Sequence, residues 1–109
     1  MASKATIQLN YRRAINQANK LENLADELRR IAKNNLNSTI SDLSNTWKGE
    51  SASAFLQKAQ KAYDDIVKNA DQLDRTASVI KRSAENVRNS ELRALEIATA
   101  REAFNKAFK

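Results

Sequence analysis

The side chains that most often perform acid–base or metal chemistry are missing from this sequence, which contains neither His nor Cys. Disulfides and thiolate metal sites are therefore excluded, and proton transfer would fall to carboxylates, Lys or Tyr. Asp64 and Asp65 form an adjacent acidic pair, but neighbouring side chains diverge on a helix. A single Gly also leaves no Gly-rich loop to hold a phosphate. We therefore predict no enzymatic activity, no catalytic residue, no metal and no cofactor.

The positive charge is the next feature that could bind something. The formal net charge is +6, and residues 75–109 carry eight Lys or Arg against four Glu. A basic balance is compatible with nucleic acid, anionic lipid or an acidic partner, and a solvated helical face explains it equally well. A basic helical nucleic-acid-binding protein of the nucleoid type is therefore the alternative function, although no zinc-finger or helix-turn-helix pattern is visible.

The one Trp and the one Gly lie close together near the middle of the chain, in Trp47-Lys48-Gly49. Gly permits positive φ, so it favours a helix end and a chain reversal here. Ser51 is expected to cap the following helix through its side chain. With no Pro anywhere, residues 46–51 are predicted to be the hinge between two long helices.

Apolar side chains recur in steps of four and three on both sides of the hinge, as on one face of a helix. This spacing predicts a first helix over 7–45 and a second over 52–88. Residues 34–46 are rich in poor helix formers, yet their apolar spacing continues. Acid-before-base pairs at i,i+4 are expected to be surface ion pairs: Asp26–Arg30, Asp64–Lys68 and Asp71–Arg75.

Asn89 and Ser90 are expected either to break the second helix or to lie within a continuation of it. The segment 90–108 is predicted to be a further helical tail that carries Phe104 and Phe108 on one face. Those two side chains are candidate docking residues.

The predicted fold is therefore all-α, a single domain over 1–109 in which two long antiparallel helices form a hairpin. A lone hairpin protects only one face of each helix, so we expect self-association or a partner, with pairing into a four-helix bundle. The larger side chains of the apolar faces are the predicted partner interface: Tyr11, Leu21, Leu24, Leu28, Ile31, Phe55, Leu56, Tyr63, Ile66, Leu73 and Ile80.

Trp47 and Gly49 at the hinge of two Pro-free, Ala-rich amphipathic helices resemble the WXG-motif family of small helical-hairpin proteins. That family comprises the early-secreted-antigen-like substrates of type VII (ESX) secretion, and the resemblance covers roughly residues 7–88. It implies an antiparallel dimer, non-enzymatic export through a membrane-bound ATPase machine, and a composite export signal to which Trp47 and Gly49 contribute. It also implies a protein that is cytoplasmic before export and secreted without a cleaved signal peptide. No stable membrane insertion is expected.

The family's second signal element, Tyr-x-x-x-Asp/Glu in the tail of the paired subunit, is missing here. The only tyrosines are Tyr11 and Tyr63, and the residue four positions after Tyr63 is Val67. We therefore expect either a homodimeric substrate or, with more weight, a partner or escort subunit. Its partner would be a related or larger helical secreted protein, such as a toxin with an LXG-type helical domain.

Overall fold

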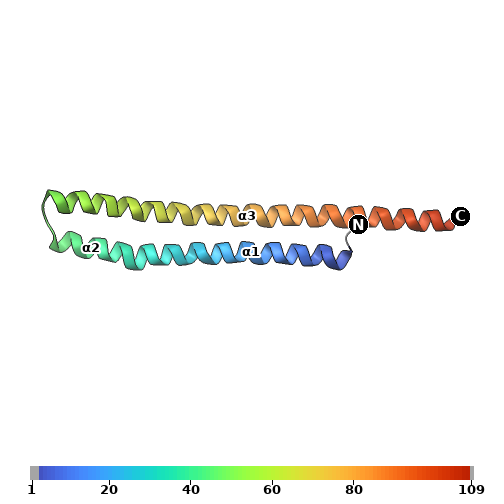
Figure 1. Cartoon of the computed structure of the whole chain (residues 1–109), viewed down its shortest axis with the longest axis horizontal. Coiled ribbons are helices and arrows are strands. Elements are labelled where there is room, and N and C mark those ends of the chain that lie inside the picture. The colour runs from blue at the N-terminus through green and yellow to red at the C-terminus, as the bar shows by residue number, and fades with distance from the viewer. Residues whose placement is uncertain (1–2, 109) are drawn as a thin grey trace. The chain divides into compact units, whose positions relative to one another are not determined.

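The computed structural model describes residues 3–108, and these residues form helices joined by one short connection (Figure 1). The elements are α1 (Lys4–Arg30), the π-helix η1 (Ile31–Leu36), α2 (Asn37–Thr46) and α3 (Glu50–Ala107). No strand occurs among the described residues, so the all-α prediction is confirmed. Pairing into a four-helix bundle stays a prediction.

Helix α1 begins at Lys4, three residues before the expected start at Ile7. Ser3 explains the difference, because its hydroxyl oxygen accepts a hydrogen bond from the Thr6 N–H at 3.1 Å. Its carbonyl oxygen also accepts the Ile7 N–H at 3.0 Å. Ser3 therefore satisfies N–H groups that the first turn of a helix leaves unpaired.

The π-helix η1 coincides with a one-residue shift in the apolar pattern. The four-three spacing that runs through Ala18, Ala25 and Ala32 would place the next apolar residue at position 35, but it is Leu36. A π-turn closes its hydrogen bonds over one more residue than an α-turn, and Asn37 N–H accordingly donates to the Ala32 carbonyl. The wider turn absorbs the extra residue, so Leu36 and Ile40 stay half-buried.

The connection between α2 and α3 spans only residues 47–49 (Figure 1). Gly49 has a φ of +111°, the positive value that the sequence predicts for the reversal. The prediction for Ser51 is wrong: α3 already begins at Glu50, and Ser51 lies inside its first turn. The Gly49 carbonyl accepts the Ser53 N–H at 3.0 Å, so Gly49 occupies the capping position that was expected for Ser51.

Helix α3 continues through Asn89 and Ser90 to Ala107, so the second helix does not end at residue 88. Asn and Ser lower helix stability by only about half a kcal/mol each relative to Ala. Neither Gly nor Pro occurs after residue 49, so nothing stronger opposes the helix. Residues 90–107 belong to α3 and do not form a separate helix, and Phe108 lies in the turn that follows.

The chain divides into two compact units. The hinge unit comprises residues 20–76, which carry nine Lys or Arg and nine Asp or Glu. The basic unit comprises residues 1–19 and 77–109, which carry ten Lys or Arg and four Glu. The entire net charge of +6 therefore lies in the basic unit.

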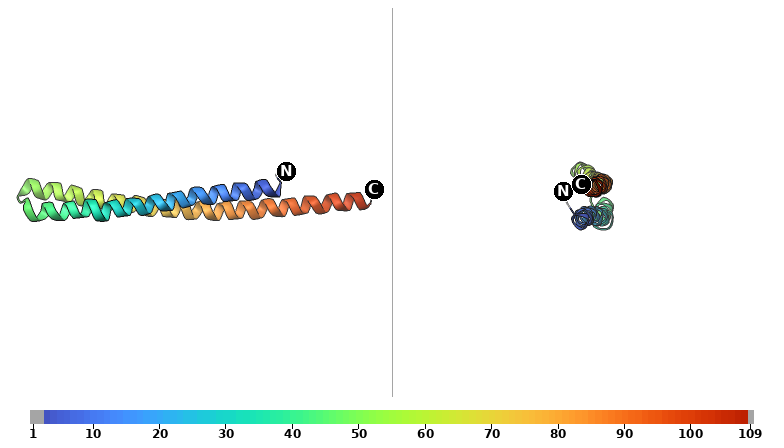
Figure 2. Two further views of the ribbon diagram at one scale, coloured as in Figure 1. Left: turned by 90° about the horizontal axis from the view of Figure 1, so that it is seen from below. Right: turned by 90° about the vertical axis from the view of Figure 1, so that its right-hand side faces the viewer.

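Within the hinge unit, α2 and the start of α3 lie side by side in Figure 1 and in the left view of Figure 2. Its almost fully buried side chains are all alanines: Ala25, Ala32, Ala52 and Ala70.

Within the basic unit, the start of α1 runs beside α3, whose last turns extend beyond it (Figure 2). Its buried side chains are Ile7, Ala18 and Ala77. Small side chains at such contacts let helix backbones approach closely. In both units the helix pair is therefore sealed mainly by alanine.

Candidate functional site

Trp47 ends α2 and lies against the first turns of α3. Its backbone is extended (φ −111°, ψ 121°), while its N–H still donates to the Leu43 carbonyl at 2.7 Å. The indole ring contacts Phe55, with ring centroids 5.5 Å apart and planes tilted by 48°. Such tilted pairs contribute about 0.5–1.5 kcal/mol beyond the area that they bury. Trp47 and Phe55 remain 40% and 48% exposed, so the hinge displays an aromatic surface.

Gly49 is required at the hinge for its backbone conformation. A Cβ atom built on it would have no neighbouring heavy atom within 4 Å, so space is not limiting. Its φ of +111° is a value that L side chains rarely adopt. The Lys48 ammonium donates to the Ser44 carbonyl at 2.8 Å and thereby pairs a carbonyl near the end of α2.

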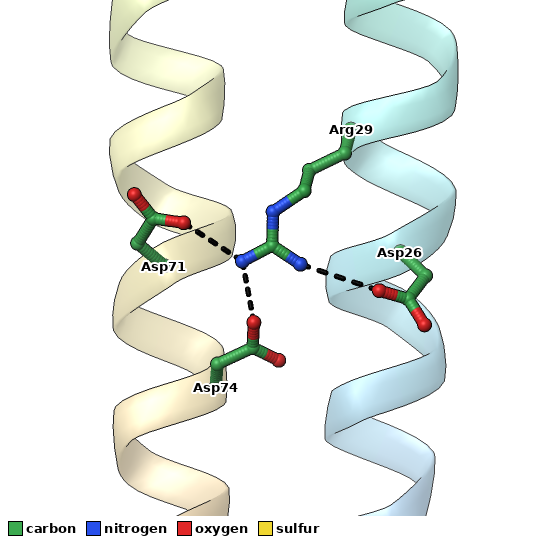
Figure 3. A network of polar contacts seen from close by, with 4 residues as sticks. All are labelled: Asp26, Arg29, Asp71 and Asp74. Atoms are coloured by element: carbon green, nitrogen blue, oxygen red, sulfur yellow. Dashed lines mark hydrogen bonds and ion pairs between the residues drawn. The ribbon is translucent and has the colours of Figure 1, made fainter.

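A second cluster in the hinge unit joins its two helix segments through Arg29 (Figure 3). The Arg29 guanidinium donates to Asp71 Oδ1 at 2.7 Å, to Asp74 Oδ2, and to Asp26 Oδ1 at 3.2 Å. Hydrogen bonds to Asp71 and then Asp74 raise the pKa of Arg29 further above its already high value, so the side chain stays charged. Asp26 and Asp71 thus pair with Arg29, and not with the expected Arg30 and Arg75.

None of the side chains predicted to form a partner interface is fully buried within the helix pairs. Ile31 is 52% exposed and Leu24 is 44% exposed. Apart from Phe55, the other predicted residues are only half-buried: Tyr11, Leu21, Leu28, Leu56, Tyr63, Ile66, Leu73 and Ile80. Alanines take the interior, so these larger side chains have surface left to cover.

In the basic unit, two of the predicted interface residues line an apolar hollow. Tyr11 and Ile80, together with Ile7, Ala84 and Val87, enclose a volume of about 360 Å³. The Arg88 guanidinium lies 4.0 Å from the centre of the Tyr11 ring, within the range of a cation–π interaction. Tyr11 is therefore held by a contact within the chain, and its role in a partner interface stays a prediction.

Phe104 and Phe108, the candidate docking residues of the tail, lie in the last turns of α3. Their ring centroids are 4.6 Å apart and their planes are tilted by 38°. They are 62% and 76% exposed, and so form an uncovered aromatic pair in the basic unit.

Sequence reasoning missed two features of the surface. It did not find the Arg29 cluster, whose cross-helix partners follow from helix register and leave no local signal. The predicted partner interface also lacks Val79, Val87 and Ile97, each 54% exposed on α3. The apolar spacing of the sequence places Ile97 on one face with Phe104 and Phe108, which is the signal that could have added it to the interface.

No helix among the described residues is long and apolar enough to cross a membrane.

Comparison with known proteins identifies a family that has the same Trp and Gly motif as the hinge. No curated protein and no solved structure matches the chain significantly. A family model described as "Proteins of 100 residues with WXG" does match, over residues 6–91, and this range includes Trp47, Gly49 and most of both helices. The chain therefore belongs to the WXG100 family of small helical proteins associated with type VII secretion.

Proposed function

We propose that this protein acts in type VII secretion as the small partner of another secreted helical protein. Its hinge would supply the Trp47 and Gly49 half of a two-part export signal. The partner, a related protein or a larger effector with its own helical domain, would supply the second half. Export as a homodimer is the other form of the same proposal.

The distribution of small and large apolar side chains carries this proposal. The helix pair of the hinge unit is closed by Ala25, Ala32, Ala52 and Ala70, each at most 1% exposed. Leucines, isoleucines and aromatic residues beside them stay half-buried or exposed. Exposed apolar surface of this extent marks an interaction site. Covering it with the helices of a partner would complete a bundle.

The missing Tyr-x-x-x-Asp/Glu element favours a separate partner over a second copy. Tyr11 and Tyr63 both lie in helices, and neither has an acidic residue four positions later. Trp47 instead is exposed at the hinge and packs only partly on Phe55. The chain thus offers one half of the signal in an accessible form.

Affinity purification from the native host, with the molar ratio of bound chains measured, tests the partner. Recovery of a second helical secreted protein in equal amount is the expected result. Recovery of only a second copy would support the homodimeric form. Salt weakens non-specific binding to nucleic acid steeply. Nucleic acid that stays bound to the protein at moderate salt would therefore indicate a nucleic-acid-binding function and contradict the proposal.

The variant Trp47→Ala tests the signal role. We expect export to fall strongly while far-UV circular dichroism stays nearly unchanged, since the lost ring pair contributes only about 0.5–1.5 kcal/mol. Phe55→Ala is the matched control, because it removes the same ring contact but keeps the Trp. Equal loss of export in both variants would indicate a structural role for the pair.

A further inference from the structure

The exposed side of α3 in the basic unit carries a stripe with coiled-coil spacing. Ser83, Ser90, Ile97 and Phe104 follow one another at seven-residue intervals. Val87, Ala94, Arg101 and Phe108 form a second series at the same interval, offset by four residues. Two such series are the a and d positions of a heptad repeat, which form a seam along one face of a helix. We call these eight residues the α3 stripe.

Most of the α3 stripe is distinct from the face by which α3 packs within the basic unit, although Ser83 and Val87 border the hollow that faces α1. That packed face contains Ala77, which is buried, and the half-buried Ile80, Ala84 and Arg88. Every residue of the stripe is instead exposed. Its large side chains Val87, Ile97, Phe104 and Phe108 are between 54% and 76% exposed. The seam is therefore formed but uncovered within the chain.

The charge around the stripe is positive. Arg101 lies in the stripe, and none of its eight positions is acidic. Arg93 lies on the helix surface beside it, three residues after Ser90 and four before Ile97, and Arg82 precedes Asn86 and Val87 on the same edge. The exposed Glu96 follows Arg82 by two heptads at the same helical position and partly offsets the positive charge of that edge. Glu91 is half-buried and belongs to the hollow that faces α1. With all six net charges in this unit, the seam favours a negatively charged occupant.

We propose that the α3 stripe is the docking site for an acidic amphipathic helix of a different protein. The inference rests on the proposed partner role and adds the chemistry of that partner: apolar a and d positions flanked by Glu or Asp. A second copy fits less well. Pairing the α3 stripes of two copies would place arginine against arginine. The hinge unit of a second copy has no net charge that could attract the positively charged stripe. A lipid surface also fits less well, because the seam is narrow and lipid-binding helices present a broad apolar face.

Two synthetic four-heptad helices test the proposal with the full chain. Both have Leu at a and d, but one carries Glu and the other Lys at the flanking e and g positions. We expect the Glu peptide to bind at least roughly tenfold more tightly at low salt. That preference should shrink toward 1 M salt, where charges are screened within about 3 Å. Fluorescence anisotropy of the labelled peptides measures both affinities.

Charge reversal on the protein makes the test specific to the stripe. The triple variant Arg82→Glu, Arg93→Glu and Arg101→Glu should reverse the preference, so that the Lys peptide binds more tightly. The control reverses three exposed lysines of the hinge unit, Lys58, Lys61 and Lys68, on the same helix. It changes the net charge equally and should keep the preference for the Glu peptide. Phe104→Ala should weaken both peptides by removing apolar contact.

Several outcomes would overturn the inference. These are equal affinity for the two peptides, an equal shift in the control variant, or a salt-insensitive homodimer that excludes both peptides. Binding to phosphatidylglycerol vesicles that is lost on Phe104→Ala, with no peptide preference, would assign the stripe to a membrane surface. Recovery of a native partner that binds the triple variant unchanged would overturn the inference and leave the proposed function intact.

Discussion

The hinge unit and the basic unit have the same construction but different surfaces. Both pair two helix segments through buried alanines. The hinge unit balances its charges, links its segments through Arg29, and displays Trp47 and Phe55. The basic unit carries all the net charge and leaves the α3 stripe exposed, with Val87, Ile97 and the pair Phe104 and Phe108 as its large apolar side chains. The comparison separates the features that close a helix pair from those that remain available to a partner.

The difference also explains why large side chains are poor markers of the interior here. An alanine interface brings helix backbones close together, so a leucine at the same point would be too large. Larger apolar residues are consequently placed beside the contact. In this chain six alanines and Ile7 are the buried residues of the intramolecular interface, and most of the larger apolar side chains keep surface that association could cover.

Enlarging an interior alanine should have the largest effect. Ala70→Leu introduces three extra carbon atoms at a site with 0% exposure, and we expect a loss of about 1–3 kcal/mol in unfolding free energy. Ala54→Leu, at an exposed position of the same helix, should change it by less than about 0.5 kcal/mol. Thermal and urea unfolding measure both. Equal effects would contradict an interior sealed by alanine.

Gly49→Val tests the backbone requirement of the hinge. Valine at a φ of +111° is strained, so we expect a cost of about 1–3 kcal/mol or a rearranged turn. Lys48→Ala removes only a side-chain hydrogen bond to Ser44 and should cost less than about 1 kcal/mol. Urea unfolding compares the two neighbours. A harmless Gly49→Val would mean that the turn tolerates another conformation.

Deleting Asn35 tests whether η1 compensates for one extra residue. The deletion restores the four-three spacing through to Trp47, and it removes an exposed residue with a helix propensity about half a kcal/mol worse than that of Ala. We expect Tm to stay the same or to rise slightly. Deleting Gln60 in the regular part of α3 should lower Tm clearly, because it displaces the apolar face. Similar losses from both deletions would show that η1 has no compensating role.

Arg29→Gln should have only a small effect. The cluster is partly solvated, so we expect Tm to fall by only a few degrees at low salt. The difference from the unmodified protein should narrow at high salt. Arg30→Gln, at the exposed neighbouring position, should change Tm less at any salt concentration. A reversed order would place the important ion pair at Arg30.

Most of the helical architecture could be predicted from local patterns. Gly49 indicated the turn, and the repeated apolar spacing indicated both helices and the family. The predictions failed for hydrogen-bond partners that depend on the folded structure. Ser3 caps α1, which therefore begins before Ile7, and Gly49 takes the capping position expected for Ser51. Arg29 pairs with Asp71 on the other helix segment. Such choices depend on which groups meet in space, and i,i+4 spacing does not report that.

The helical class, the reversal at Gly49 and the amphipathic faces could all be predicted from the amino-acid sequence, because each follows from residue propensity and period over a few turns. Which residues of those faces are buried within the chain depends on how the helices pack against each other. Close packing selected Ala25 and Ala70 for the interior and left Leu24, Ile31 and Phe104 exposed. It also widened one turn at Ile31–Leu36, because packing a face requires continuous register and an extra residue must be absorbed somewhere.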